Sequence, residues 1–450
     1  MKAIKNTFAE IRRYPSAVIG LIIIILLITT AVVVMISIPY NEAIRLWRGG
    51  EGVWYQNPKT APPVWTNWFT ADDLPPSIFL SEEDENVEKV REEGESTVDI
   101  FYTFNFEYNY DAYPQEVAIF LNGEFEEKQP FADIYWIKPD GTELRLISEG
   151  IPSTRTVYLS QEDSLTRRVE RETGFEDILL GMFGIPETDP PQVMKGSYQL
   201  RIEGIAFEPD SDLQVEYILY GQVHGVAGTD HLRRDLSVAL LWGIPIALAF
   251  GLIASVGTTV LTMIIAATGV WYGGWVDELI QRITEVNLVL PFLSILVMVG
   301  TFYSKSIWVI LGVTVLLSIF GGGIKTYRAN FMQIKESMYI EAAQAYGAND
   351  VRIIFLYLIP RIVPLLIPGL VSSIPAFVFL EASLAVLGLG DPILPTWGKI
   401  INDAQQNGAL YNGMYYWILE PAVLLMITGL AFAMLGFSLD RIFNPRLRGL

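Results

Sequence analysis

Uncharged apolar runs long enough to cross a membrane occur near the start of this 450-residue chain and throughout its second half. The first run covers 22 residues, 17–38, and a helix needs about 20 apolar residues to span a bilayer core. Four basic residues precede this run: Lys2, Lys5, Arg12 and Arg13. A cleaved signal peptide has a shorter apolar region that ends in small residues, whereas proline and tyrosine follow here. We therefore predict a retained transmembrane helix with its N-terminus in the cytoplasm.

Five more spans are predicted in the second half. Asp235 and Asp277 bracket 41 uncharged residues, which is too many for one span and too few for two spans with a polar turn. We interpret this stretch as an interfacial start at 236–245, one span to about residue 267 and a glycine-rich turn at 272–274. Four shorter uncharged runs supply the remaining spans: 286–304, 306–324, 362–380 and 421–439.

The distribution of basic residues agrees with six spans and two cytoplasmic termini. Three arginines follow the last span: Arg441, Arg446 and Arg448. The segment between the fourth and fifth spans is also cytoplasmic in this topology and carries five bases: Lys325, Arg328, Lys335, Arg352 and Arg361. Arg233 and Arg234 lie on the outer side, an exception that long translocated regions allow. The polar region after the first span is then extracytoplasmic.

Residues 41–225 follow the two-residue period of strands. Alternation of polar and apolar residues, together with a hairpin turn at 139–141, predicts strands at 97–108, 134–138, 143–147, 197–203 and 213–220. The charged stretch 162–180 has helical spacing, and the acidic stretch 81–95 is expected to be loop or helix. Several short strands with regular turns predict a β-sandwich.

Net charge separates the two parts of the chain. The formal charge is −19, and residues 40–229 hold 36 acidic and 14 basic residues, a balance of −22. All other residues together hold 14 acids and 17 bases, a balance of +3. We therefore expect an N-terminus and first span at 1–40, an acidic β-rich domain at 41–225 and a five-span membrane core at 226–450.

Several kinds of chemistry are excluded by composition. The chain has no cysteine, so disulfides, cysteine-ligated metals and thiol catalysis are ruled out, and two histidines offer little for a histidine site. The segment 321–326 resembles a P-loop only superficially, because the required leading glycine and the glycine before the lysine are missing. We expect no catalytic residue, metal site or cofactor in this chain and no nucleic-acid partner.

The most informative polar segment is the cytoplasmic loop that contains Glu341-Ala342-Ala343, Gly347 and Pro360. Small residues on a short helix let another protein approach its backbone closely. Glu341 suits the positive end of the helix dipole, Gly347 can end the helix, and Pro360 opens the next apolar segment. An ordinary amphipathic loop helix would explain this composition equally well.

The spacing of this segment resembles the EAA loop of ABC importer permeases. Glu-Ala-Ala is followed by three residues, glycine, nine residues and an apolar ending with proline, although Tyr357 and Ile359 depart from the usual ending. Further motifs, in family order, resemble the second permease subunit of the oligopeptide/dipeptide (peptide/nickel) family: 13–20, 228–235, 274–277, 381–383, 388–390, 397–398 and 444–446. The resemblance covers about 1–40 and 226–450. Arg233 stands where the family has glycine, and the short stretch after the family's first span is here 186 residues long.

This resemblance implies the type I ABC importer permease fold and a transport role, not an enzyme. It implies a cell-membrane subunit that pairs with a sister permease as a heterodimer and binds two ATP-binding subunits, which hold ATP and Mg²⁺. An extracytoplasmic solute-binding protein would deliver peptides or similar small solutes. The EAA loop, 326–361, would dock on an ATPase subunit through Glu341, Ala342, Ala343 and Gly347, with support from Arg328 and Arg352.

Three residues of the fifth span are candidates for the translocation path: Glu381, Ser372 and Ser373. An ionisable group in a membrane helix is costly, so Glu381 is interpreted either as a pore-facing group that meets a peptide amine or as part of a capped helix end. The two serines could open the backbone toward the path, but helix packing explains them equally well.

The resemblance says nothing about 41–225, which could dock the solute-binding protein, contact the sister subunit or bind substrate. Its first aromatic residues indicate either an interface or a headgroup belt with internal packing: Trp54, Tyr55, Trp65, Trp68 and Phe69. A membrane-anchored ligand receptor or sensor is the alternative function, but it needs neither six spans nor an EAA loop. A secondary transporter is expected to show inverted repeats, and none is found.

Overall fold

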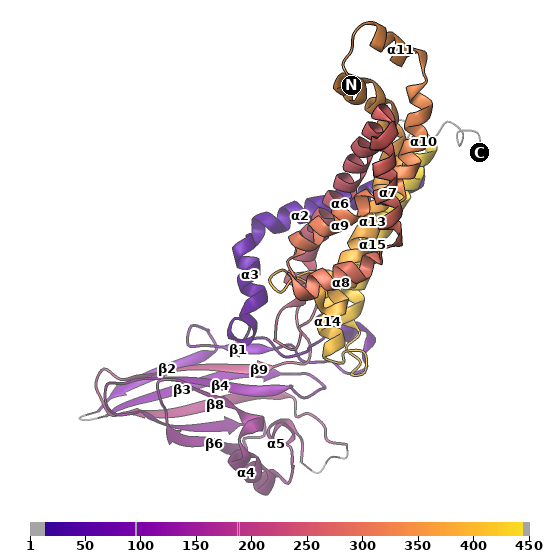
Figure 1. Ribbon diagram of the computed structural model, residues 1–450. Helices are drawn as coiled ribbons and strands as arrows, with labels where there is room; N and C mark the ends of the chain where they lie inside the picture. Colours follow the sequence, from indigo (N-terminus) through magenta and orange to yellow (C-terminus); the bar gives the residue numbers. More distant parts are fainter. Residues whose placement is uncertain (1–13, 95–96, 187, 189, 444–450) are drawn as a thin grey trace. The chain divides into compact units, whose positions relative to one another are not determined.

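The computed structural model describes residues 14–94, 97–186, 188 and 190–443. The predictions that rest on Lys2, Lys5, Arg12, Arg13, Arg446, Arg448 and the motif at 444–446 lie outside the described residues. The chain divides into two compact units (Figure 1). We call Met1–Arg48 with Ser237–Leu450 the membrane unit and Gly49–Leu236 the inserted unit.

The inserted unit begins and ends later than the expected domain 41–225. The segment before it packs with the membrane helices, and the segment at its end packs with the inserted unit. Helix α3 (Tyr40–Gly49) buries Ala43 against Val34 and Trp242, so it belongs with the membrane helices. At the other boundary, the Thr229 hydroxyl accepts a hydrogen bond from the Ala61 amide (3.0 Å) and donates to the Pro58 carbonyl (2.8 Å). Residues just before 237 therefore fold with the inserted unit.

Four helices of the membrane unit are long and apolar enough to cross a bilayer. They are α2 (Pro15–Ser37), α6 (Leu236–Tyr272), the helix Asp350–Leu389 and α15 (Tyr416–Phe443). The helix Asp350–Leu389 consists of α12 (Asp350–Arg352), the π-helical turn η4 (Ile353–Leu358), α13 (Ile359–Leu384) and the π-helical turn η5 (Ala385–Leu389). The stretch 236–245, expected as an interfacial start, and the span expected to about residue 267 lie in one helix, because α6 is continuous through Pro245.

Two uncharged runs that were predicted as single spans, 286–304 and 306–324, are each broken in the structure. Helices α7 (Gly274–Val289) and α8 (Phe292–Phe302) meet at 77°, and α9 (Ile307–Ile319) and α10 (Gly323–Lys335) meet at 47°. Pro291 explains the first break, since a proline pushes the preceding residue into an extended conformation. The second break falls at three consecutive glycines, 321–323. The described helices give six spans only if each bent pair counts as one.

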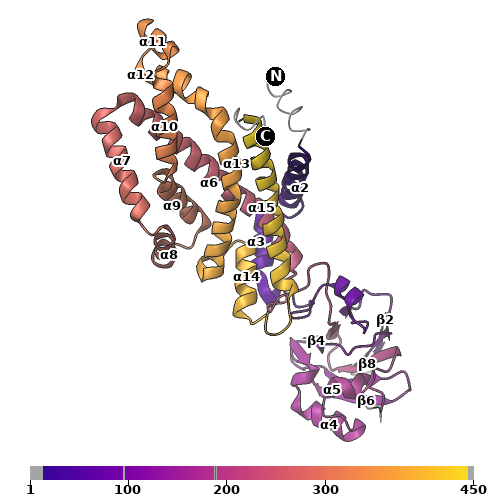
Figure 2. The same ribbon diagram turned by 90° about the vertical axis from the view of Figure 1, so that its right-hand side faces the viewer.

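Small residues bring the long helices close together. Helix α15 packs against both α13 and α2 (Figure 2). A Cβ added at Gly20 would lie 2.6 Å from the Ala431 carbonyl oxygen, and one at Gly436 would collide with Ser372. Side-chain-free positions at helix contacts are typical of membrane bundles, where close backbone approach replaces the hydrophobic driving force. Helices α11 (Met338–Ala345) and α14 (Trp397–Gln406) complete the membrane unit as described.

The inserted unit contains two antiparallel sheets. One has the order β1 (Ile78–Leu80), β9 (Asp212–Tyr220), β4 (Glu116–Glu124), β7 (Arg155–Tyr158). The other has the order β2 (Val87–Glu93), β3 (Val98–Tyr108), β8 (Gly196–Ala206), β5 (Phe131–Ile137), β6 (Glu143–Gly150). Side chains from both sheets enter one hydrophobic core. The β-rich prediction is confirmed, and two sheets that share a core form a β-sandwich.

The core of the inserted unit is aromatic. The Trp136 ring is completely buried and lies 5.1 Å from Phe183 and 5.3 Å from Tyr198 between ring centroids. Its indole nitrogen donates to the Met182 carbonyl at 3.1 Å. Two helices, α4 (Asp163–Thr173) and α5 (Ile178–Phe183), close this part of the core, whereas the sequence predicted one helix over 162–180. Gly174 separates them because it adopts a φ of +80°, a conformation that favours glycine.

The stretch 81–95 was predicted as loop or helix, and this prediction is wrong for residues 87–93, which form strand β2. Seven residues pair with β3, from Val87 opposite Phe104 to Glu93 opposite Val98. Charged side chains hid the strand from sequence analysis, because β2 is the edge of its sheet and most of its side chains face solvent. Edge strands often carry charges that prevent pairing with other proteins. Short 3₁₀ turns complete the unit at η1 (Gly50–Gly52), η2 (Val64–Phe69) and η3 (Leu159–Gln161).

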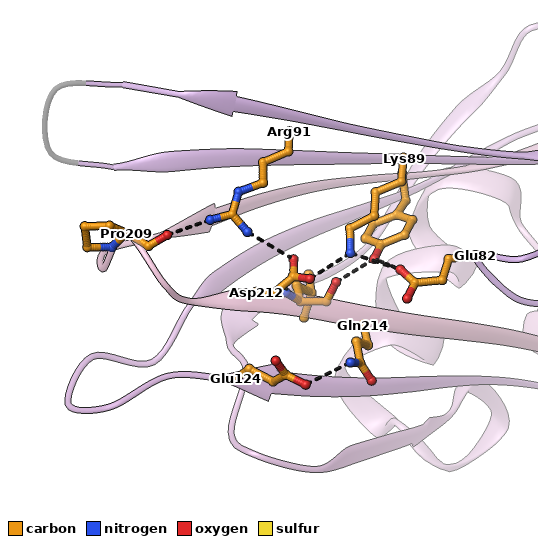
Figure 3. A network of polar contacts seen from close by, with 9 residues as sticks. Glu82, Lys89, Arg91, Glu124, Pro209, Asp212 and Gln214 are labelled. Atoms are coloured by element: carbon orange, nitrogen blue, oxygen red, sulfur yellow. Dashed lines mark hydrogen bonds and ion pairs between the residues drawn. The ribbon is translucent and has the colours of Figure 1, made fainter.

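A polar network fastens this edge strand to the opposite sheet (Figure 3). Lys89 of β2 donates to Glu82 and to Asp212 of β9, both at 2.9 Å. The Tyr102 hydroxyl beside it bonds the Leu213 carbonyl at 2.6 Å. Although burial opposes its charge, the contacts with Tyr102, Asp212 and Glu82 raise the pKa of Lys89 above its usual value. The lysine therefore stays charged and joins β2 of one sheet to β9 of the other.

Candidate functional site

The predicted EAA segment forms a short helix with defined ends. Ser337 is extended and precedes α11, and Gly347 follows the helix with a φ of +78°. A residue in the left-handed conformation just after a helix lets the chain turn away and provides hydrogen bonds for the last helix carbonyls. Here the Gly347 amide donates to the Gln344 carbonyl at 2.9 Å. Asn349 then caps the next helix by accepting from the Arg352 amide at 2.8 Å.

The two faces of α11 differ in exposure. Glu341 and Ala342 are exposed, whereas Ala343 and Ile340 are buried. Ile340 packs in a cluster that contains Phe331 of α10. Of the residues predicted to contact an ATPase, Glu341, Ala342 and Gly347 thus lie on the accessible surface, and Ala343 fixes the helix to the rest of the membrane unit.

Polar side chains before and after α11 bind the C-terminal end of α6. The Lys335 ammonium donates to the carbonyls of Val270 (2.8 Å) and Trp271 (3.1 Å), which no longer have partners within the helix. Lysines near a helix C-terminus also interact favourably with its dipole. The Trp271 indole donates to the Asp350 carboxylate at 3.0 Å, a few residues after α11. The segments on the two sides of α11 are therefore held at the same helix terminus.

Arg328 and Arg352, which were both predicted to support ATPase contact, occupy different environments. The Arg328 guanidinium binds Asp277 of α7 through two nitrogens, at 2.8 Å from Nε to Oδ1 and 2.6 Å from Nη2 to Oδ2. It therefore joins α10 to α7 inside this chain. Arg352 is exposed, and among the described residues no acidic group forms an ion pair with it.

Sequence reasoning missed large apolar side chains around α11. Tyr346 is 93% exposed and Met338 is 85% exposed. Val351, Phe355 and Leu356 are also exposed nearby in the sequence. Their presence in a loop otherwise rich in charged residues was the available signal. Exposed apolar side chains this close in the sequence to Glu341 and Ala342 are of the kind that protein-binding surfaces contain.

The three candidates for the translocation path also occupy different environments in the structure. Glu381 is buried beside Thr396 and Asp391, in a small cavity that Lys305 also lines. The Ser373 hydroxyl lies 2.6 Å from that of Ser255 on α6 and bonds the Leu370 carbonyl. Ser372 is exposed and packs against Gly436 of α15. Ser373 thus joins two helices, Glu381 is buried near the end of α13, and Ser372 is the one exposed residue of the three candidates.

Comparison with known proteins identifies the family to which the membrane unit, with these groups, is similar. Residues 258–449 match the family described as binding-protein-dependent transport system inner membrane component, and this match lies wholly in the membrane unit. The chain is 30% identical over 224 residues to the dipeptide transport system permease protein DppC of Bacillus subtilis, which is 49% of this chain and 68% of that protein. The chain belongs to the binding-protein-dependent transport system inner membrane component family. This permease is also 29% identical over 224 residues to the glutathione transport system permease protein GsiD of Pectobacterium atrosepticum, covering 49% and 72% of the two chains.

Family membership establishes several properties of this permease. It is a multi-pass membrane subunit of an ABC importer of the oligopeptide/dipeptide type and not an enzyme. Its partners include ATPase subunits and a binding protein. The receptor or sensor alternative is not supported, because the matched relatives are transport permeases.

Proposed function

We propose that this permease forms half of a translocation path with a sister permease and imports short peptides or similar small solutes. In this proposal the bent helix pairs α7–α8 and α9–α10 each cross the membrane once, giving six spans with both termini in the cytoplasm. Support comes from the five bases between residues 325 and 361, which favour a cytoplasmic loop. The inserted unit then lies outside the membrane. ATP and Mg²⁺ bind in the partner ATPase subunits.

The observation that carries the proposed mechanism is the anchored loop. The exposed residues Glu341 and Ala342 would enter a cleft of an ATPase subunit, with Tyr346 and Met338 packing around them. When the ATPase subunits close on ATP, the docked helix moves. Lys335 and the Trp271–Asp350 bond tie the loop to α6, so the movement reaches a transmembrane helix directly. Two discrete arrangements of packed helices can convert such a shift into alternating access.

A second connection carries the same movement to α7. The Arg328–Asp277 pair uses two parallel hydrogen bonds, a geometry that fixes orientation as well as distance. Helix α10 therefore cannot rotate without displacing α7. Arg352, which is exposed after α11 in the same loop, is the basic group that would meet an acidic residue of the ATPase.

The substrate class is proposed from the relatives. Two of these relatives are a dipeptide permease and a glutathione permease, and we infer peptide-like cargo for this permease. Ser372 is the one exposed residue among the three path candidates and is our candidate for contact with a polar backbone group of the cargo. Uptake of labelled dipeptides into proteoliposomes that contain the full transporter tests this inference, and uptake of unrelated solutes with no effect of peptide competitors would contradict it.

Replacing Gly347 tests the docking function. Gly347→Asp places a side chain at a φ of +78°, with open space around it, so the helix end must change without a collision. Gly141→Asp is a matched control, because Gly141 has a φ of +84° and open space in a turn of the inserted unit. We expect ATPase subunits to co-purify with the Gly141 variant but not with the Gly347 variant. A stable complex with undiminished coupled ATPase activity in Gly347→Asp would refute the docking role of this loop.

A further inference from the structure

The inserted unit exposes one cluster of large apolar side chains. In the part of this unit that the structure describes, eight large apolar residues are exposed, and five form the cluster: Val64, Trp65, Trp68, Phe69 and Val226. The other three lie on or beside β2 and β8: Val90, Ile205 and Phe207. Trp68 and Phe69 are 82% and 81% exposed. We call the five residues the aromatic patch. Such a patch is unexpected on a unit whose surface is otherwise acidic.

The patch is held in a fixed shape. Four of its residues lie on the 3₁₀ turn η2, and the Trp65 indole donates to the Val226 carbonyl at 2.9 Å. The Val64 amide donates to Gly225 at 3.0 Å, and the Trp65 and Phe69 rings meet edge to face with centroids 6.4 Å apart. Two chain segments thus hold the exposed aromatic rings in place. Trp54 and Tyr55, the other aromatic residues predicted here, are only partly exposed, and Tyr55 bonds Glu216.

The start of an apolar helix lies next to this patch within the same unit. The amide of Leu236, the first residue of α6, donates to the Gly228 carbonyl at 3.1 Å. Gly228 is two residues from Val226. The intervening turn is closed by Asp230, whose carboxylate accepts from the Arg234 amide and side chain at 2.9 and 2.6 Å. The helix α6 is long and apolar enough to span a bilayer, so its beginning marks the approach of the chain to a membrane surface.

The composition of the patch favours lipid over a charged partner. Residues 60–71 contain no charged side chain, and the neutral polar residues Thr66, Asn67 and Thr70 stand among the rings. Trp side chains favour the headgroup level of a bilayer, where an apolar ring meets a wet boundary. Two acidic residues follow at Asp72 and Asp73, which disfavours attraction to anionic lipid. Neutral phospholipid headgroups are therefore the matching surface.

We propose that the aromatic patch inserts into the headgroup layer of the bilayer and holds the inserted unit against the membrane. Trp68 and Phe69 enter the layer, and Trp65 links them to the segment that leads into α6. Such contact limits the tilting of the inserted unit about its two chain connections. This contact needs a membrane surface at the start of α6, on either side of the membrane, so the contact can be absent without any effect on the proposed transport function.

The natural absence of cysteine permits a direct test. Phe69→Cys and Val90→Cys variants of the full chain are spin-labelled and measured in nanodiscs of neutral phosphatidylcholine, with oxygen and a water-soluble nickel chelate as collision partners. Val90 is the matched control because it is also exposed and apolar in the inserted unit. We expect a severalfold higher ratio of oxygen to nickel collisions at 69 than at 90. Equal ratios at the two sites would overturn the proposal, and so would a label at 69 that neither reagent reaches, since that result indicates a protein interface.

A label-free measurement guards against disturbance by the cysteine substitution. Quenching of tryptophan fluorescence by brominated phosphatidylcholine is compared for the unmodified chain, Trp68→Phe and Trp136→Phe. Trp136 is buried in the core and serves as the control. The fraction of quenched fluorescence should fall in Trp68→Phe and not in Trp136→Phe. Unchanged quenching in Trp68→Phe would contradict insertion, and replacement of neutral by anionic lipid should not increase quenching in the unmodified chain.

Discussion

The membrane unit and the inserted unit are stabilised in different ways. Long helices of the membrane unit approach through glycines such as Gly20 and Gly436, and a few polar bonds fix their ends. The inserted unit buries aromatic rings between two sheets and carries the acidic surface. The family match covers 258–449, inside the membrane unit. The family match thus lies in one unit, and the second unit has a hydrophobic core of its own.

Removing the central ring of the aromatic core should have the largest effect. Trp136→Ala deletes a completely buried side chain and its bond to Met182, and such changes cost about 3–5 kcal/mol. Because the core is confined to the inserted unit, we expect that unit to unfold at lower denaturant concentration while ATPase subunits still co-purify. Limited proteolysis reports the first effect. If the variant lost both the folded inserted unit and the bound ATPase subunits, the two units would not fold independently.

Detaching the EAA loop from α6 should have an intermediate effect. Lys335→Met removes two hydrogen bonds from a charged donor, each worth about 1.5–3 kcal/mol. We expect ATPase subunits to remain bound while the ATPase stimulation by the loaded binding protein falls roughly tenfold. The matched control is Lys59→Met in the inserted unit, where the pair with Glu51 is exposed. Equal stimulation in both variants would show that Lys335 transmits no movement.

Acid should weaken the inserted unit slightly through Glu208. Hydrogen bonds from the backbone amides of Glu126, Glu127 and Lys128 lower the pKa of Glu208 from its usual 4.5 to about 2. A carboxylate whose pKa is lower in the folded state stabilises the fold above its unfolded pKa. This contribution is therefore lost as the pH falls from about 4.5 to about 2. Chemical unfolding of the inserted unit measures the effect, and the difference between the unmodified chain and Glu208→Gln should shrink over this range. A constant difference would exclude Glu208 as its source.

Much of the architecture could be predicted from periodicity and charge. The apolar runs located the long helices, and alternation located β3, β5, β6, β8 and β9. Two kinds of failure have physical causes. Hydropathy does not detect a bend, so the breaks at Pro291 and at glycines 321–323 were assigned to continuous spans. Charged side chains on an edge strand remove the alternation, so β2 was missed although its backbone pairs fully with β3.

The candidate site was only partly predictable. The EAA motif located α11, but three-residue spacing cannot tell which side chains face inward, and the structure buries Ala343. Arg328 was expected to reach a partner protein, yet its bond to Asp277 depends on contact between residues 51 positions apart. Lys335 and Trp271 were missed for the same reason. Long-range polar contacts of this kind leave no local pattern in one sequence.

The most direct test of the central claim, that the exposed face of α11 docks an ATPase subunit, measures thiol reactivity at Ala342. In this cysteine-free chain, Ala342→Cys introduces a single thiol on that face, and Val90→Cys provides an exposed thiol in the inserted unit. We predict that binding of the ATPase subunits strongly slows maleimide labelling at 342 and leaves labelling at 90 unchanged. Equally rapid labelling at 342 with and without bound ATPase subunits would contradict the claim.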